Sequence, residues 1–308
     1  MNRNAIERAL ERYAGHKDPS VREALANWGP LLLEAADIIE SLRPADARAN
    51  EPTNKEIDHA VRGGAPILSL GLLQIDESAY AAALERLAKA YASTLTHEGR
   101  IDEAKKRAIE SIDWRPFASK AVILDAARDV PGYLERSEAL WATVRGELDE
   151  SLFDECIAVV LGLAMRAFLD KYARQCARLA DMRDSPVVDY ERRLTCPVCG
   201  SAPILALVAP TARTGNAKRL FCGACGATWK FERIRCAVCG DEAVSDLKYV
   251  HDEADPAHRL HVCAGCGAAM PTVFLSGEDE AAAAPDIEYL VAEALADAYL
   301  SEAPRSGN

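Results

Sequence analysis

The chain has 308 residues, of which 49% are hydrophobic and 27% are charged, as is usual for a soluble protein with room for two domains. Its formal net charge of −12 argues against sequence-independent nucleic-acid binding, which depends on lysine and arginine facing phosphates. The most apolar run, residues 157–169, is interrupted by Arg166 and is too short for stable membrane insertion. The first residues lack the apolar core of a signal peptide, and ten cysteines without export predict a reducing, cytoplasmic location.

Residues 1–185 are expected to form an all-α domain, because apolar side chains recur at helical spacing through most of this stretch. Asp18-Pro19-Ser20 is typical of a helix start, and Ser185-Pro186 is placed to end the longest helix. Residues 44–52 predict a polar connection, whereas periodicity assigns no secondary structure to residues 67–75. The predicted helices cover residues 18–39, 76–96, 102–111, 117–128, 131–145 and 149–182.

The C-terminal part contains four copies of one motif, C-x-x-C-G, which begin at Cys196, Cys222, Cys236 and Cys263. The two-residue gap lets both sulfur atoms of a tight turn face one ion. The glycine tolerates positive φ, so backbone N–H groups can point at the sulfurs. A single C-x-x-C motif is weak support for a metal site, because redox pairs share it. Four copies in one short stretch strongly indicate metal binding.

The spacing of the motifs indicates how they pair. The third motif repeats the first after 40 residues and the fourth repeats the second after 41, which describes one ribbon that occurs twice. A crossed arrangement, in which the middle two motifs share an ion, stays open but breaks this repeat. Four thiolates leave no open coordination position, so each site is expected to be structural. The predicted ligand sets are Cys196, Cys199, Cys222 and Cys225 for one ion and Cys236, Cys239, Cys263 and Cys266 for the other.

Short antiparallel strands are expected between the motifs. Trp229 and Phe231 are expected to form the core of the first ribbon. His251, His258 and His261 are interpreted as loop residues, because the eight cysteines already complete two sets of four. The predicted strands cover residues 204–208, 219–221, 229–234, 247–250, 260–262 and 272–275.

Two further cysteines and the tail also carry predictions. Cys156 and Cys176 lie in the longest predicted helix and are expected to be buried as small apolar side chains. Residues 285–300 place apolar side chains on one face of a helix that is expected to pack back on the protein. Residues 190–235 contain eight Lys or Arg and two Asp or Glu, whereas residues 236–275 contain two and six. The first ribbon is therefore basic and the second acidic.

Taken as a whole, the sequence predicts an α+β fold in four segments. Residues 1–185 would form the helical domain, and residues 186–235 and 236–277 would form two tandem four-cysteine ribbons of the zinc-ribbon kind. Residues 284–302 would form the C-terminal amphipathic helix.

This arrangement resembles the formate dehydrogenase accessory protein family. The residues that carry the resemblance are Cys196-Pro-Val-Cys-Gly-Ser201, the stretch from Leu220 to Trp229, Arg233-Ile-Arg-Cys236, the motif at Cys263 and the tail over residues 286–296. The resemblance implies a cytoplasmic maturation factor rather than a dehydrogenase, one that is needed for active respiratory formate dehydrogenase and binds its catalytic subunit. It also implies rubredoxin-like ribbons that hold two iron ions, although four thiolates suit zinc equally well. The oligomeric state is left open.

Two other functions compete with this interpretation. A zinc-ribbon protein that binds nucleic acid is supported only by Arg213, Lys218, Arg219, Lys230, Arg233 and Arg235. An electron carrier would use iron at the ribbons, with N–H donors near the sulfurs to adjust the potential. The sequence contains no glycine-rich phosphate loop with its lysine, no G-x-S-x-G and no H-E-x-x-H, so no catalytic residues and no enzyme activity are predicted.

Overall fold

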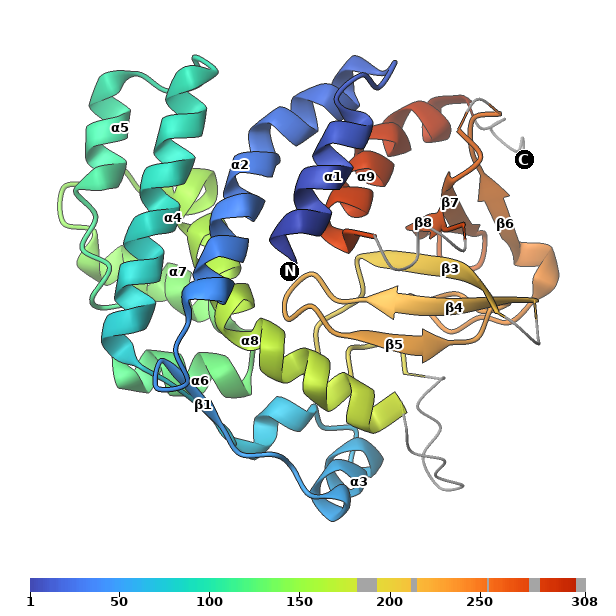
Figure 1. Ribbon diagram of the computed structural model, residues 1–308, viewed down its shortest axis with the longest axis horizontal. Helices are drawn as coiled ribbons and strands as arrows, with labels where there is room; N and C mark the ends of the chain where they lie inside the picture. The colour runs from blue at the N-terminus through green and yellow to red at the C-terminus, as the bar shows by residue number, and fades with distance from the viewer. Residues whose placement is uncertain (182–192, 212–214, 254, 277–282, 303–308) are drawn as a thin grey trace.

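The structure is a computed structural model, and it describes residues 1–181, 193–211, 215–253, 255–276 and 283–302. Helices from the first half of the chain lie on one side, and a sheet from the second half lies on the other (Figure 1). The last described helix returns to pack against the first two helices. Among the described helices, none combines the length and apolar character needed to cross a bilayer.

The helical part contains eight α-helices, and three of the predicted starts have side-chain caps. Asp18 accepts a hydrogen bond from the backbone of Ser20, with Pro19 at the first helical position, and Asp76 and Asp102 cap two later helices in the same way. The helices are α1 (Arg3–Tyr13), α2 (Pro19–Ser41), α3 (Asn54–Arg62), α4 (Glu77–His97), α5 (Glu103–Glu110), α6 (Lys120–Arg128), α7 (Tyr133–Val144) and α8 (Ala158–Asp181).

Local pattern did not single out helices α1 and α3, and it missed two further features of this part. Strand β1 (Ala47–Ala49) in the expected polar connection pairs antiparallel with β2 (Leu73–Ile75), so the helical domain also holds a small sheet; the 3-10 helix η1 (Ile67–Leu70) precedes β2. The predicted helix over 149–182 instead has a π-helical segment, η2 (Phe153–Ile157), before α8. Ser185-Pro186, its expected end, lies outside the described residues.

The second half forms one six-stranded sheet in the order β5-β4-β3-β8-β7-β6. Five strand pairs are needed for that order; four are antiparallel, and β3 pairs with β8 in parallel, with Ala206 opposite Thr272. Each predicted strand is confirmed to within a few residues, and the parallel pair joins the two ribbons edge to edge. The strands are β3 (Leu205–Thr211), β4 (Gly215–Phe221), β5 (Thr228–Phe231), β6 (Leu247–Val250), β7 (His258–Cys263) and β8 (Ala269–Phe274), with a 3-10 turn η4 (Val244–Asp246) before β6.

Two large apolar cores connect the halves. The first surrounds α8, contains most of the helical domain and continues into the first ribbon through Trp229 and Phe231, which are buried as expected. The second core joins α1 and α2 to β7 and the tail helix α9 (Pro285–Glu302). Ile287 and Val291 of α9 are fully buried there, which confirms that the tail packs back on the protein.

Candidate metal centres

All four C-x-x-C-G motifs adopt one backbone conformation. In each, the N–H of the glycine donates to the carbonyl of the first cysteine at 2.8–3.1 Å, and the glycine φ lies between +74° and +85°. The N–H of the first cysteine donates to the residue after the glycine at 2.8–3.0 Å, which closes the turn. Because L side chains rarely adopt this φ, the repeated glycine is required by the turn itself. The glycines are Gly200, Gly226, Gly240 and Gly267.

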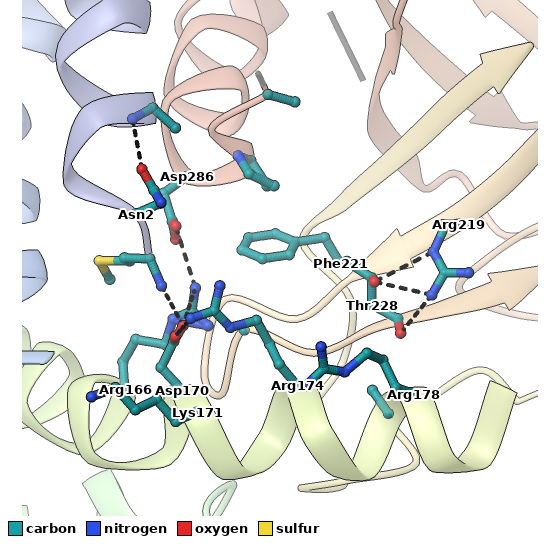
Figure 2. Close-up of a pocket in the computed structure, with 16 residues that line it drawn as sticks. Asn2, Arg166, Asp170, Lys171, Arg174, Arg178, Arg219, Phe221, Thr228 and Asp286 are labelled. Atoms are coloured by element: carbon teal, nitrogen blue, oxygen red, sulfur yellow. Dashed lines mark hydrogen bonds and ion pairs between the residues drawn. The ribbon is translucent and has the colours of Figure 1, made fainter. Parts of the chain in front are cut away.

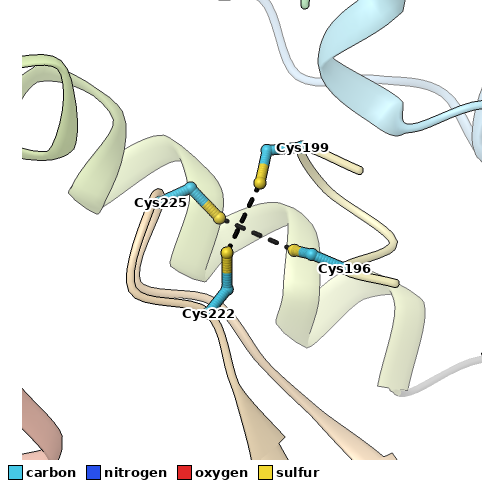
Figure 3. Close-up of side chains that lie close together, drawn as sticks. All are labelled: Cys196, Cys199, Cys222 and Cys225. Atoms are coloured by element: carbon cyan, nitrogen blue, oxygen red, sulfur yellow. Dashed lines mark hydrogen bonds between the residues drawn. The ribbon is translucent and has the colours of Figure 1, made fainter. Parts of the chain in front are cut away.

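The sulfur atoms gather into two sets, and they pair as the internal repeat predicted. One set contains Cys196, Cys199, Cys222 and Cys225, which point at a common centre from two turns (Figure 3), and the other contains Cys236, Cys239, Cys263 and Cys266. Within each set all four sulfurs lie within 4.8 Å of one another. The crossed arrangement of the middle two motifs is therefore wrong.

The spacing of the sulfurs fits a tetrahedral thiolate site. A metal–sulfur bond of about 2.3 Å places the corners of a tetrahedron about 3.8 Å apart. In the first set, Cys196 lies 3.6 Å from Cys225 and Cys199 lies 3.4 Å from Cys222. In the second set the corresponding pairs are 3.8 and 3.9 Å apart. Each set of residues is thus able to hold one metal ion, with four-coordinate geometry that suits zinc or iron.

The two sets differ in their surroundings. All four cysteines of the first set are buried, and they belong to the main apolar core. Two N–H groups of η1, from Ile67 and Leu68, donate to the carbonyls of Pro197 and Val198 at 3.0 and 2.9 Å, so the helical domain grips the first turn directly. Burial raises the pKa of the Cys196 thiol well above its usual value, and four thiolates at this depth require a cation among them.

The second set is half open to solvent. Cys236 and Cys263 are buried, whereas Cys239 and Cys266 are exposed. The N–H groups of Val238 and Cys239 point at the sulfur of Cys236 at 3.4 and 3.5 Å, which is the arrangement expected for a thiolate in such a turn. Thus the sequence motif is the same in both ribbons, but of the two sets only the second contains exposed cysteines.

The expectation that the three histidines are loop residues holds for His251 and is wrong for the other two. His258 and His261 lie on strand β7 and are buried. The Nζ of Lys218 lies 3.4 Å from His261 Nδ1 and donates to the carbonyl of Arg235 at 3.2 Å. Burial, followed by the nearby Lys218 charge, lowers the pKa of His261 to about 4, so this ring is neutral.

His258 belongs to a buried polar network between the second ribbon and the helices. Its Nδ1 lies 2.8 Å from Asp255, and its Nε2 lies 3.1 Å from Glu288 of α9. The hydroxyl of Tyr13 on α1 donates to the same Glu288 carboxylate at 2.7 Å. Burial lowers the pKa of His258, but hydrogen bonds and charge from both carboxylates outweigh it and raise the pKa to about 9. The imidazolium therefore links β7 to α9.

The two cysteines outside the sets are buried, as predicted. Burial raises the pKa of Cys156 to about 12 and that of Cys176 to about 11, so both remain protonated thiols. Sequence reasoning also missed Arg166, whose guanidinium is buried against the first cysteine set. A Cβ added at Gly226 would clash with Arg166 Nη1. The signal for this contact was a charged residue inside the most apolar stretch of the chain.

Comparison with known proteins agrees with this architecture. The protein-family model described as "FdhE, central domain" matches residues 195–233. An FdhE homolog from Pseudomonas aeruginosa is 25% identical over 203 residues, which are 61% of this chain and 62% of that protein. An FdhE homolog from Enterobacter sp. (strain 638) is 31% identical over 106 residues, which are 34% of this chain and 33% of that protein. The aligned part of the chain thus spans less than two thirds of these relatives' length.

The fold extends the likeness to the whole chain. The crystal structure of the FdhE protein from Pseudomonas aeruginosa superimposes with a TM-score of 0.59 at 18% identity, covering 99% of this chain and 93% of that chain. Fold and site together define a class of protein in which a helical domain carries two ribbons. The four cysteines of each ribbon together are able to hold one metal ion. Within that class the chain is similar to FdhE proteins, in agreement with the resemblance that the cysteine motifs and the tail indicated.

Proposed function

We propose that this chain is a cytoplasmic accessory protein needed for the formation of active respiratory formate dehydrogenase, and that it binds the catalytic subunit of that enzyme. The proposal assigns it no catalytic residues and no enzyme activity of its own. The similarity to FdhE proteins and the family resemblance of the cysteine motifs support this role. The eight cysteines of the two sets are the proposed metal ligands.

The observation that carries the proposal is the apolar surface around the second cysteine set. Six large hydrophobic side chains are exposed among the described residues, and four of them lie in or beside the second ribbon. Such a concentration of exposed apolar side chains marks a protein-binding surface. The four are Ile234, Val238, Val244 and Tyr249, which are 56%, 51%, 68% and 38% exposed.

Charge supports a protein partner at the same place. Val238 lies between two proposed ligands, and Asp241, Glu242 and Asp246 follow within a few residues. An apolar centre with an acidic rim suits oriented docking on a protein surface. The basic residues that would favour nucleic acid do not form one exposed face, because Lys218 is buried; Arg213 lies outside the described residues. The catalytic subunit is therefore the proposed occupant.

Co-purification tests this proposal. The chain is tagged, and the amount of catalytic subunit that co-purifies with it is measured. We expect Val238→Asp and Val244→Asp to lower this amount by about tenfold or more, because each places a charge in the apolar contact. Leu134→Asp and Val144→Asp are matched controls, since these side chains are 39% and 38% exposed on the helical domain. All four variants should keep their full metal content. Equal recovery in all four, or normal formate dehydrogenase activity in cells that lack the protein, would contradict the proposal.

Iron is the proposed metal, on the strength of the rubredoxin-like resemblance, with zinc able to take its place. Protein prepared without oxygen from iron-sufficient cells should contain two iron ions per chain and show thiolate-to-iron absorption. Colourless protein that contains only zinc under these conditions would contradict iron.

A second candidate function is electron transfer, and the exposure of Cys239 and Cys266 favours it. An iron site with two exposed ligand residues would be close enough to a docked protein to exchange an electron with it, whereas the first set is enclosed. Reversible reduction of one iron ion per chain, lost in Cys266→Ser, would support this function. The absence of any reversible couple would leave only the docking role.

A further inference from the structure

A cleft of about 560 Å³ opens where the two halves of the protein meet. Figure 2 shows α8 along its floor, the β4–β5 hairpin on one side and the starts of α1 and α9 on the other. Its volume lies within the range of small-molecule sites. Gly226, which follows Cys225 of the first cysteine set, lies in the wall of the cleft. No cysteine of the second set lines the cleft.

The cleft is strongly cationic although the chain as a whole carries a net charge of −12. Lys171, Arg174 and Arg178 recur at three- and four-residue spacing, so they share one face of α8. Arg219 approaches from β4, where its guanidinium donates to Thr228. Five cationic side chains thus face two carboxylates, which leaves an excess of three positive charges. The charged side chains are Arg166, Lys171, Arg174, Arg178, Arg219, Asp170 and Asp286.

Internal ion pairs account for only part of this charge. Arg174 pairs with Asp170, and Arg166 Nη2 lies 3.5 Å from Asp170 and 3.3 Å from Asp286. Lys171 and Arg178 are exposed and have no ion pair or hydrogen-bonded side-chain partner among the residues that the structure describes. Both carboxylates are therefore already matched within the cleft, and Lys171 and Arg178 have no counter-charge among the described residues that line it.

Arg166 adds a second, independent sign of a ligand. Its side chain is only 3% exposed, yet Nε and Nη1 have no hydrogen-bond acceptor among the described residues. Buried guanidinium N–H groups are almost always hydrogen-bonded, because leaving them unpaired costs about 1–3 kcal/mol or more. Arg166 lines the cleft. Its buried positive charge, only partly matched by Asp170 and Asp286, adds to the positive potential of the cleft.

Two helix ends add to the positive potential. Asn2 precedes α1, and Pro285 begins α9, and both residues line the cleft. The N-terminal end of a helix carries a partial positive charge and directs backbone N–H groups outwards. Side chains, helix ends and the unpaired donors of Arg166 thus favour negative charge at one place.

We propose that this cleft binds a small molecule that carries a phosphate group. Planar guanidinium groups match phosphate oxygens in pairs, and four of the five cations are arginines. The excess of three positive charges favours a ligand with at least two negative charges. Phe221 also lines the cleft, where the Arg166 guanidinium lies over its buried ring, 5.3 Å from the ring centre. This site is separate from the proposed docking surface, so either proposal can fail without the other.

Calorimetric titration of the full chain, in a buffer free of phosphate and sulfate, tests the site with inorganic pyrophosphate and with adenosine monophosphate. The variant Lys171→Gln/Arg178→Gln should weaken binding of the preferred probe by about a hundredfold, or tenfold for each lost charged contact. Lys89→Gln/Arg107→Gln is the control, since it removes two exposed cations on α4 and α5. Tighter binding of the nucleotide would identify an organic phosphate, and tighter binding of pyrophosphate an inorganic one.

Three outcomes would overturn the proposal. One is that both probes bind with dissociation constants above about 10 mM, which is weaker than we expect for a specific site of this charge. Another is that the Lys171→Gln/Arg178→Gln variant and the control bind equally well. The third is that a triglutamate peptide binds more tightly than both phosphates, which would assign the cleft to an acidic protein segment. Unchanged metal content and thermal midpoint in both variants ensure that the comparison concerns binding.

Discussion

The two cysteine sets share a sequence motif, a turn geometry and a tetrahedral spacing, but they differ in what surrounds them. The first is fully buried and continuous with the core of the helical domain, and backbone hydrogen bonds from η1 reach its first turn. The second has two exposed cysteines, and four of the six exposed large apolar side chains among the described residues lie in or beside its ribbon. The metal-binding set of the first ribbon is thus part of the protein core, whereas that of the second ribbon is partly exposed to solvent. A metal-binding motif alone does not distinguish these uses; the packing around it does.

The largest expected effect comes from removing one ligand of each set. Cys222→Ser should lower the free energy of unfolding by more than about 3 kcal/mol, because the buried thiolates that remain lose their cation inside the main core. Cys266→Ser should cost less than about 1 kcal/mol for the helical domain, because the second set opens locally. Urea unfolding followed by the helical circular dichroism signal measures both.

Metal analysis completes that experiment. Each variant should lose one metal ion, whereas Cys176→Ser, which removes a buried thiol outside the sets, should keep both. If Cys222→Ser and Cys266→Ser lower the free energy of unfolding equally, the buried first set and the partly exposed second set do not differ in their contribution to stability.

A smaller effect is expected where the second ribbon is attached to the helices. The pKa of His258 is raised to about 9 from an ordinary 6.5, so its contribution to stability is complete below pH 6.5 and is lost as the pH rises through about 9. His258→Gln should therefore cost roughly 3 kcal/mol near about pH 6 and much less near about pH 10.

The exposed His251 is the matched control, because it is the ring on this ribbon that lies in a loop. His251→Gln should leave stability unchanged at both pH values. A cost for His258→Gln that does not depend on pH would show that the ring acts by packing rather than by its charge. The first ribbon, attached through an apolar core, should show no comparable loss at high pH.

The smallest effect is expected from replacing two glycines by alanine, since the two positions have similar backbone conformations and differ in their surroundings. Gly226 and Gly267 have φ values of +79° and +74°, so alanine at either position carries the same backbone strain of about 1–2 kcal/mol. At Gly267 an added Cβ meets nothing within 4 Å, whereas at Gly226 it meets Arg166. Gly226→Ala should cost about 1–3 kcal/mol more than Gly267→Ala in urea unfolding. Equal costs would mean that Arg166 moves aside freely.

The sequence predicted what depends on short-range pattern. The cysteine sets follow from the spacing of C-x-x-C-G, because a turn that directs two sulfurs at one ion needs only neighbouring residues. The strands and the tail helix follow from the periodicity of their apolar side chains. Even the pairing of the sets could be inferred, because a repeated spacing describes a repeated unit.

Features that depend on distant contacts escaped prediction. The three-residue strands β1 and β2 are too short for a periodic signal, and they exist because they pair with each other. The sequence predicts a loop position for His258 and names Lys218 only as support for nucleic-acid binding, but Glu288 and the Arg235 carbonyl supply partners for the two side chains inside the protein. The cationic cleft joins α8, β4 and two helix starts, so no single stretch of sequence contains it.

The parallel joint between β3 and β8 has a consequence for how the duplicated ribbon is arranged in space. Each unit orders its strands identically, so the first strand of one unit meets the third strand of the other: the repeat is a translation, not a two-fold rotation. Contacts of that kind do not close on themselves and can in principle continue to further units. At one end α8 packs against β5 and terminates the series (Figure 1). At the other end β6 is the outermost described strand, so growth is limited from one side only.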